Sequence, residues 1–81
     1  MKALTLTAYN QFEFSDAPDP VIEDNEVLIA VKACGICGSD IHATAEGGIA
    51  RRGGVLGHEV AGEIASLGPD PIGDWSVGDR V

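Results

Sequence analysis

The sequence predicts a mostly β chain of 81 residues with one short helix near its middle. Two observations support this prediction. Apolar and polar residues alternate in several short runs, which is typical of strands with one buried face. Glycine is abundant, at 11 positions, and together with proline it marks the turns between these runs. No internal repeat and no linker divides the chain, so we expect one small domain.

The first 16 residues are expected to form a hairpin. Leu4, Leu6 and Ala8 alternate with threonines, and the alternation resumes at residues 12–14 after a turn at 9–11. The segment that follows contains two prolines, which lack the amide hydrogen that strand pairing needs. We therefore expect the hairpin to end before this segment.

The strongest strand signal lies at residues 26–33, where valine and isoleucine recur at every second position. A short helix is then expected to begin at Ser39, whose hydroxyl can cap it, and to run to about Glu46. Residues 47–54 contain two arginines and several glycines and are expected to form an exposed loop.

Residues 59–67 fit either a helix or a strand. Gly62 favours a strand with a kink or bulge, because glycine weakens a helix interior by about 1 kcal/mol. A turn at 68–71 follows, and residues 75–81 are expected to form a second turn that enters a further strand.

Charge and composition narrow the possible functions. Thirteen acidic and five basic residues give a net charge of −8, which excludes the basic surface of a nucleic-acid-binding protein and disfavours an anionic membrane. The longest apolar run, 27–31, is far shorter than the ~20 residues that span a bilayer, and the first residues do not resemble a signal peptide. Two cysteines are too few for a disulfide-stabilised secreted domain. We expect a cytoplasmic protein with no nucleic-acid or membrane partner.

Two short segments contain every cysteine and histidine of the chain, together with two carboxylates. These residues are Cys34, Cys37, Asp40, His42, His58 and Glu59. Thiolate, imidazole and carboxylate are the ligand types that Zn²⁺ prefers. Gly57 suits a backbone that turns sharply just before His58.

The residues alone leave three interpretations open. A zinc-binding module could use Cys34, Cys37, His42 and His58 as its four ligands. The Cys34–Cys37 pair, spaced as C-x-x-C, could also be a thiol redox pair, although such a pair normally opens the helix of a βαβ unit. The third interpretation is a pair of buried, inert cysteines. The sequence contains no G-x-G-x-x-G, so it lacks the dinucleotide-binding fingerprint.

Three motifs in order resemble the N-terminal part of zinc-dependent medium-chain alcohol dehydrogenases. They are Cys34-Gly35-Ile36-Cys37-Gly38-Ser39-Asp40-Ile41-His42, Leu56-Gly57-His58-Glu59 and Val77-Gly78-Asp79-Arg80-Val81. The form Cys-Gly-Ser-Asp-x-His is most similar to the polyol branch, which includes sorbitol, xylitol and butanediol dehydrogenases. The resemblance covers essentially the whole chain. It implies that residues 1–81 are an incomplete N-terminal part of the chaperonin-10-like (GroES-like) catalytic β-barrel, with the Rossmann domain absent from this chain.

The resemblance also implies a zinc site. Cys37 matches the thiolate ligand of the catalytic zinc and His58 matches its imidazole ligand. Glu59 matches a carboxylate beside the metal, which ligates zinc directly in polyol-type members. Asp40 matches the carboxylate that orients the zinc-bound histidine. Cys34 matches no ligand of the family.

Proton transfer is implied for two further residues. Ser39 matches the hydroxyl that takes the proton from the substrate alcohol, and His42 matches the distal end of that relay. The implied reaction is the oxidation of a secondary alcohol or polyol with NAD or NADP, in a parent protein that is expected to be a homo-oligomer. Gly38 stands where liver-type members have a basic residue that helps to hold the cofactor, so no cofactor-binding residue is assigned in this chain. By itself the chain is expected to lack turnover, because nothing in it holds the hydride acceptor.

Overall fold

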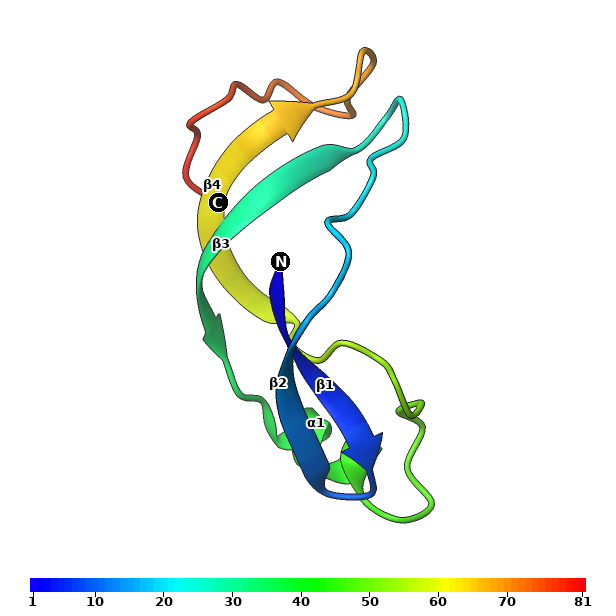
Figure 1. The fold of residues 1–81 in the computed structure, drawn as a ribbon. Helices are drawn as coiled ribbons and strands as arrows, with labels where there is room; N and C mark the ends of the chain where they lie inside the picture. Colours follow the sequence, from blue (N-terminus) through cyan, green and yellow to red (C-terminus); the bar gives the residue numbers. More distant parts are fainter. The chain divides into compact units, whose positions relative to one another are not determined.

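The computed structural model describes residues 1–81 and contains four strands and one helix (Figure 1). Their bounds are β1 Lys2–Ala8, β2 Gln11–Asp16, β3 Val27–Gly35, α1 Gly38–Thr44 and β4 Glu59–Leu67. The predicted mostly β fold with one short helix after Cys37 is confirmed. The chain forms two compact units, one made of residues 1–19 and 35–59 and the other of residues 20–34 and 60–81.

In the first unit, β1 and β2 form the predicted hairpin. The strands are antiparallel, and their register pairs Leu4 with Phe14 and Leu6 with Phe12. Asn10 in the connecting turn has a φ of 55°, in the left-handed region that asparagine tolerates better than most residues. The turn therefore accounts for the change of direction that the sequence predicted.

Burial along β1 differs from the predicted alternation. Leu6 is 2% exposed, but Leu4 and Ala8 on the same predicted face are only half-buried. Ala3, on the opposite face, is 5% exposed. The burial of β1 thus does not follow a strict alternation, and its register with β2 shifts between Leu6 and Ala8.

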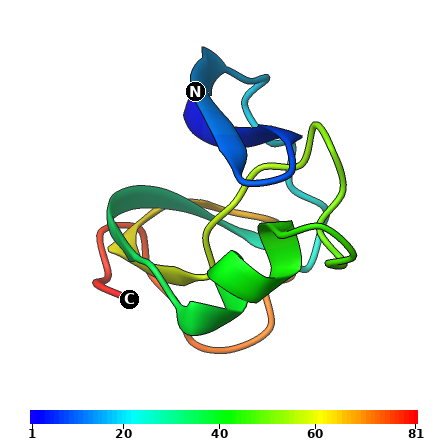
Figure 2. The same cartoon turned by 90° about the horizontal axis from the view of Figure 1, so that it is seen from below.

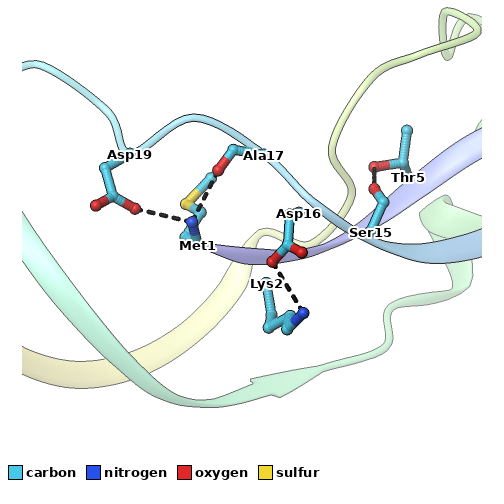
Figure 3. Close-up of polar contacts among 7 residues, drawn as sticks. All are labelled: Met1, Lys2, Thr5, Ser15, Asp16, Ala17 and Asp19. Atoms are coloured by element: carbon cyan, nitrogen blue, oxygen red, sulfur yellow. Dashed lines mark hydrogen bonds and ion pairs between the residues drawn. The ribbon is translucent and has the colours of Figure 1, made fainter.

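Polar contacts tie the two ends of the hairpin together (Figure 3). Lys2 Nζ lies 2.9 Å from Asp16 Oδ1 across the strand pair. The N-terminal ammonium of Met1 donates hydrogen bonds of 2.8 Å to the Ala17 carbonyl and to Asp19 Oδ1. This hydrogen bond and the charge of the ammonium hold the pKa of Asp19 below its usual value.

The other edge of β1 pairs with residues 53–56. The Leu6 amide donates to the Gly54 carbonyl at 3.1 Å, and the Leu56 amide donates to the Leu4 carbonyl at 3.0 Å. These residues lie at the end of the predicted exposed loop, and they lead the chain directly to His58. The hairpin therefore fixes the path of the backbone into the candidate site.

Helix α1 begins and ends earlier than the sequence predicted (Figure 2). Its N-cap is Cys37, so the prediction that Ser39 caps the helix is wrong. The Cys37 amide is instead satisfied by Asp40 Oδ2, which accepts its hydrogen bond at 2.9 Å. At the other end, the buried hydroxyl of Thr44 donates to the Asp40 carbonyl at 2.7 Å. No helix of the structure has the length and apolar character required to cross a membrane.

In the second unit, β3 and β4 form a two-stranded sheet in which the strands run in opposite directions (Figure 1). The ambiguous segment 59–67 is thus a strand, as favoured from the sequence. A side chain at Gly62 would overlap the carbonyl oxygen of Ala30 and lie 3.0 Å from Ile29 Cγ2. The close approach of the two strands therefore requires glycine at this position.

The end of the chain pairs with β4, which agrees with the prediction that residues 75–81 enter a further strand. Gly62 and Val81 exchange backbone hydrogen bonds of 2.9 and 3.0 Å. Glu63 and Arg80 form an isolated β-bridge, and Ile64 beside it is 2% exposed. The last residues of the chain thus add a short stretch of backbone pairing to the sheet of this unit.

Candidate metal site

Three of the predicted site residues lie together in the first unit. The ligand atoms of Cys37, His58 and Glu59 all lie within 4.8 Å of one another. Cys37 is half-buried at the N-cap of α1, whereas His58, just before β4, and Glu59, the first residue of β4, are exposed. A helix end and a strand end thus contribute one thiol, one imidazole and one carboxylate.

Gly57 sets the direction of the backbone before His58. Its φ is 111°, a conformation that side-chain-bearing residues rarely adopt. The sharp turn predicted from Gly57 is therefore confirmed.

Asp40 connects two members of this cluster through its two carboxylate oxygens. Oδ1 lies 3.2 Å from His58 Nδ1, and Oδ2 accepts a hydrogen bond from the Cys37 amide at 2.9 Å. The Asp40 side chain is 20% exposed, so both contacts are partly shielded from water. The contact with His58 is the one that the family resemblance implied. The contact with Cys37 was missed, although an acidic residue three positions after an N-cap is a signal for it.

Ser39 lies on the other side of the His58 ring. Its Oγ is 3.3 Å from His58 Nε2, so each ring nitrogen of His58 has a polar partner. Ser39 lies in the first turn of α1, after the N-cap Cys37. Its hydroxyl faces the imidazole and does not cap the helix.

The neighbours of Cys37 favour the thiolate form. The Ser39 hydroxyl, the Ser39 backbone amide and His58 all form hydrogen bonds that lower the pKa of Cys37. Partial burial and the nearby charge of Glu59 oppose this lowering without cancelling it. The thiolate is the form of cysteine that binds metals.

The pKa of His58 is raised above its ordinary value. The hydrogen bond with Cys37 is the main cause, and the negative charge of Asp40 adds to it. These shifts stabilise the thiolate of Cys37 and the imidazolium of His58 relative to the isolated side chains. Since metals bind the neutral imidazole, protonation of His58 competes with metal binding at this site.

His42 lies outside the cluster of ligand atoms. It is exposed, and it lines a cavity of about 500 Å³ together with Ser39, Ile49 and His58. The structure thus brings His42 to the same cavity as Ser39 but does not connect the two by a hydrogen bond.

Cys34 is not part of the cluster either. It is exposed, and no disulfide joins it to Cys37.

The donor set fits zinc. In a tetrahedral shell with Zn–N distances of ~2.0–2.1 Å and Zn–S distances of ~2.3 Å, two ligand atoms of one ion lie ~3.3–3.7 Å apart. The ligand atoms of Cys37, His58 and Glu59 lie within 4.8 Å of one another, so small side-chain rotations would bring them around one ion. A sulfur, a nitrogen and an oxygen donor also match the preference of zinc for mixed ligands, and three protein ligands leave one position open.

Comparison with known proteins gives a family match for most of the chain. Residues 23–81 match the alcohol dehydrogenase GroES-like domain. This segment contains both parts of the candidate metal site.

Two curated relatives match the chain over its full length. The sorbitol dehydrogenase of Bacillus subtilis (strain 168) is 42% identical over 85 residues, which are 100% of this chain and 24% of the relative. The uncharacterized zinc-type alcohol dehydrogenase-like protein YdjL of Escherichia coli (strain K12) is 38% identical over 84 residues, with 100% and 23% covered. The chain therefore spans about a quarter of the length of these relatives.

A solved structure also matches the chain. The alcohol dehydrogenase TADH from Thermus sp. ATN1 superimposes with a TM-score of 0.90 at 30% sequence identity. The match covers 99% of this chain and 23% of that protein.

Proposed function

Because this chain belongs to the alcohol dehydrogenase GroES-like domain family, we propose that it is the zinc-binding N-terminal part of an NAD(P)-dependent dehydrogenase that oxidises a secondary alcohol or polyol. The family match and the solved relative confirm the resemblance and the GroES-like fold that three sequence motifs predicted. The names of the relatives support an oxidoreductase, and one of them acts on sorbitol. The proposed activity belongs to a longer protein, since the chain covers only 24% of that relative.

The observation that supports the zinc site is the cluster of Cys37, His58 and Glu59. These three residues would hold the ion, and the name of one relative, a zinc-type alcohol dehydrogenase-like protein, agrees with this choice of metal. A zinc ion bound there would act as a Lewis acid toward the oxygen of the substrate alcohol. Asp40 would hold the His58 ring in position through Nδ1, and Nε2, which lies 3.3 Å from Ser39 Oγ, would bind the metal.

Ser39 and His42 would handle the proton of the alcohol. Both line the 500 Å³ cavity beside His58, so a substrate hydroxyl in this cavity lies within reach of Ser39. As the alcohol O–H bond breaks, Ser39 Oγ accepts that proton and passes its own toward His42. Because Ser39 and His42 are not hydrogen-bonded to each other, we propose that a water molecule or a substrate hydroxyl connects them.

The residues of this chain do not fit a nicotinamide cofactor. The sequence contains no G-x-G-x-x-G fingerprint, and Gly38 offers no side chain to a pyrophosphate. We therefore assign no cofactor-binding residue here and derive no hydride-transfer step. The hydride acceptor is proposed to bind to another part of the enzyme.

The four-ligand zinc module and the thiol redox protein are less well supported. The module requires Cys34 and His42 as ligands, but the cluster in the structure contains Glu59 in addition to Cys37 and His58 and omits those two. The redox pair does not account for the cluster of Cys37, His58 and Glu59, whereas a zinc site does.

The zinc content of the purified chain and of three variants tests the proposal. We expect one zinc ion per chain, retained in Cys34→Ser and lost in Cys37→Ser and His58→Ala. Cys34→Ser is the matched control, because it removes the neighbouring thiol and leaves the cluster intact. Loss of zinc from Cys34→Ser would contradict the proposed ligand set and favour the four-ligand module.

A further inference from the structure

We propose that Gly35 is a positioning residue for Glu59. Its missing side chain leaves the space that the Glu59 carboxylate occupies beside Cys37 and His58. This inference rests on the proposed zinc site and extends it by a residue that touches no metal.

The side chain of Glu59 runs directly past the α-carbon of Gly35. A methyl group at Gly35 would lie 2.5 Å from Glu59 Oε2, 3.4 Å from its Cβ and 3.6 Å from its Cδ. Ordinary contacts between non-bonded carbon atoms are ~3.5–4.0 Å. Alanine at this position would therefore collide with the carboxylate and touch the rest of the side chain.

The backbone of Gly35 does not by itself require glycine. Five glycines of the chain have a positive φ, among them Gly57, but Gly35 is not one of them. It ends strand β3 in a conformation that alanine can also adopt. The requirement for glycine thus comes from the space that Glu59 fills.

The collision would move the carboxylate and leave the fold in place. The atom nearest to the added methyl group is the far end of a flexible side chain, which can rotate away. Rotation moves the carboxylate oxygen of Glu59 away from the ligand atoms of Cys37 and His58, so that the three no longer lie within 4.8 Å of one another. Gly35→Ala is therefore expected to leave Cys37 and His58 in place and to remove the third ligand.

Gly38 provides a matched control on the other side of Cys37. A methyl group at Gly38 would meet no atom within 4 Å, and Gly38 has no positive φ. Gly38→Ala therefore adds the same methyl group without displacing Glu59.

The test measures zinc affinity by competition with a chromophoric chelator, and the absorption spectrum of the Co²⁺-substituted chain. We expect Gly35→Ala and Glu59→Gln each to bind zinc at least about 10-fold more weakly, with altered Co²⁺ spectra, and Gly38→Ala to match the unmodified chain. Adding Gly35→Ala to Glu59→Gln should cause no further loss. Equal affinities of Gly35→Ala and Gly38→Ala, or full additivity in the double variant, would overturn the inference.

Two further variants distinguish a failure of the proposed zinc site from a failure of the proposed role of Gly35. If Cys37→Ser binds zinc as tightly as the unmodified chain, the proposed zinc site is wrong. If Cys37→Ser loses zinc and Gly35→Ala does not, only the role of Gly35 is wrong. If Gly35→Ala unfolds the chain, Gly35→Ala/Glu59→Ala should refold it, since the colliding atoms are gone. Failure of that double variant to refold would overturn the inference.

Discussion

Asp40 contacts two of the three proposed ligands of the candidate site. One carboxylate oxygen lies 3.2 Å from His58 Nδ1, and the other accepts the hydrogen bond of the Cys37 amide at 2.9 Å. A single side chain thus holds two of the three proposed ligands. Because Asp40 also forms the capping box of α1 with Cys37, local folding and metal binding depend on the same residue.

Asp40→Asn is expected to weaken zinc binding about 10- to 100-fold, as is typical when a residue that supports a metal ligand is replaced. The negative charge of Asp40 contributes to the raised pKa of His58. Its removal should therefore lower the pKa of His58 in the metal-free chain. NMR titration of the His58 ring measures this directly, and an unchanged pKa would show that Asp40 does not act on His58.

Ser39 is expected to control the reactivity of the Cys37 thiol. Its hydroxyl is the main cause of the lowered pKa of Cys37. In Ser39→Ala this pKa should rise toward its ordinary value, and alkylation by iodoacetamide should reach half of its maximal rate at a higher pH. The measurement uses metal-free protein with Cys34→Ser in both samples, so that one thiol reacts. Identical pH profiles would contradict the role of Ser39.

The sequence predicted which residue types gather at the site but not all of their contacts. The C-x-x-C and Gly-His-Glu motifs identified Cys37, His58 and Glu59, which the structure brings together. The helix cap was wrongly assigned to Ser39, because the sequence does not show that its hydroxyl faces the His58 ring. Side-chain direction depends on how the two segments meet, which spacing along the chain does not encode.

At the scale of elements, the β1–β2 hairpin is held mainly by apolar packing. Leu6 is 2% exposed, whereas Lys2 and Asp16 are 76% and 79% exposed in their side chains. An exposed ion pair contributes ~0–1 kcal/mol, while burial of a leucine contributes several times more. The hairpin therefore depends on Leu6 more than on its ion pair.

Leu6→Ala is expected to lower the free energy of unfolding by about 2–5 kcal/mol, since it leaves a cavity beside β1. Asp16→Asn, which removes only the ion pair with Lys2, should cost less than about 1 kcal/mol. Urea unfolding of both variants measures the difference. Equal losses would contradict the view that apolar packing holds the hairpin.

Gly62→Ala is expected to destabilise the β3–β4 sheet by about 1–3 kcal/mol, because its methyl group would overlap the Ala30 carbonyl. This residue is at the point where β4 is paired on both edges, with β3 and with Val81. Glu63→Ala at the next, exposed position is the control. A stability of Gly62→Ala equal to that of the control would show that the strands can separate at no cost.

The elements were predicted well where periodicity was clear and less well at their ends. The hairpin, the strand at 26–33 and the strand at 59–67 are confirmed. Strand β3 continues through Gly35, past the predicted end at residue 33, and α1 stops at Thr44 before the predicted end at Glu46. The periodicity of apolar residues does not mark these ends, because it fades where the buried face of an element ends.

At the scale of the whole molecule, few apolar residues are buried. The buried hydrophobic residues are Ala3, Leu6 and Ile64, while Phe14 and Ile49 are 78% and 91% exposed. The core is thus thin, as is common for a chain of 81 residues. A bound metal ion is therefore expected to contribute a large share of the stability of this chain.

Zinc is expected to raise the midpoint of thermal unfolding, by an amount that corresponds to ~2.7 kcal/mol when free zinc is 100 times its dissociation constant. Cys37→Ser should remove this effect, and a chelator should reverse it.

The purified chain should not oxidise sorbitol with NAD or NADP, because no residue in it is assigned to the cofactor. Zinc-dependent turnover by the purified chain would contradict this limit.

X-ray absorption at the zinc edge of the zinc-loaded chain tests the proposed ligand set most directly. One sulfur ligand at ~2.3 Å with nitrogen and oxygen ligands at ~2.0–2.2 Å is the result that Cys37, His58 and Glu59 predict. Two sulfur ligands would contradict it, because the proposed set contains one sulfur; Cys34 is the other cysteine of the chain.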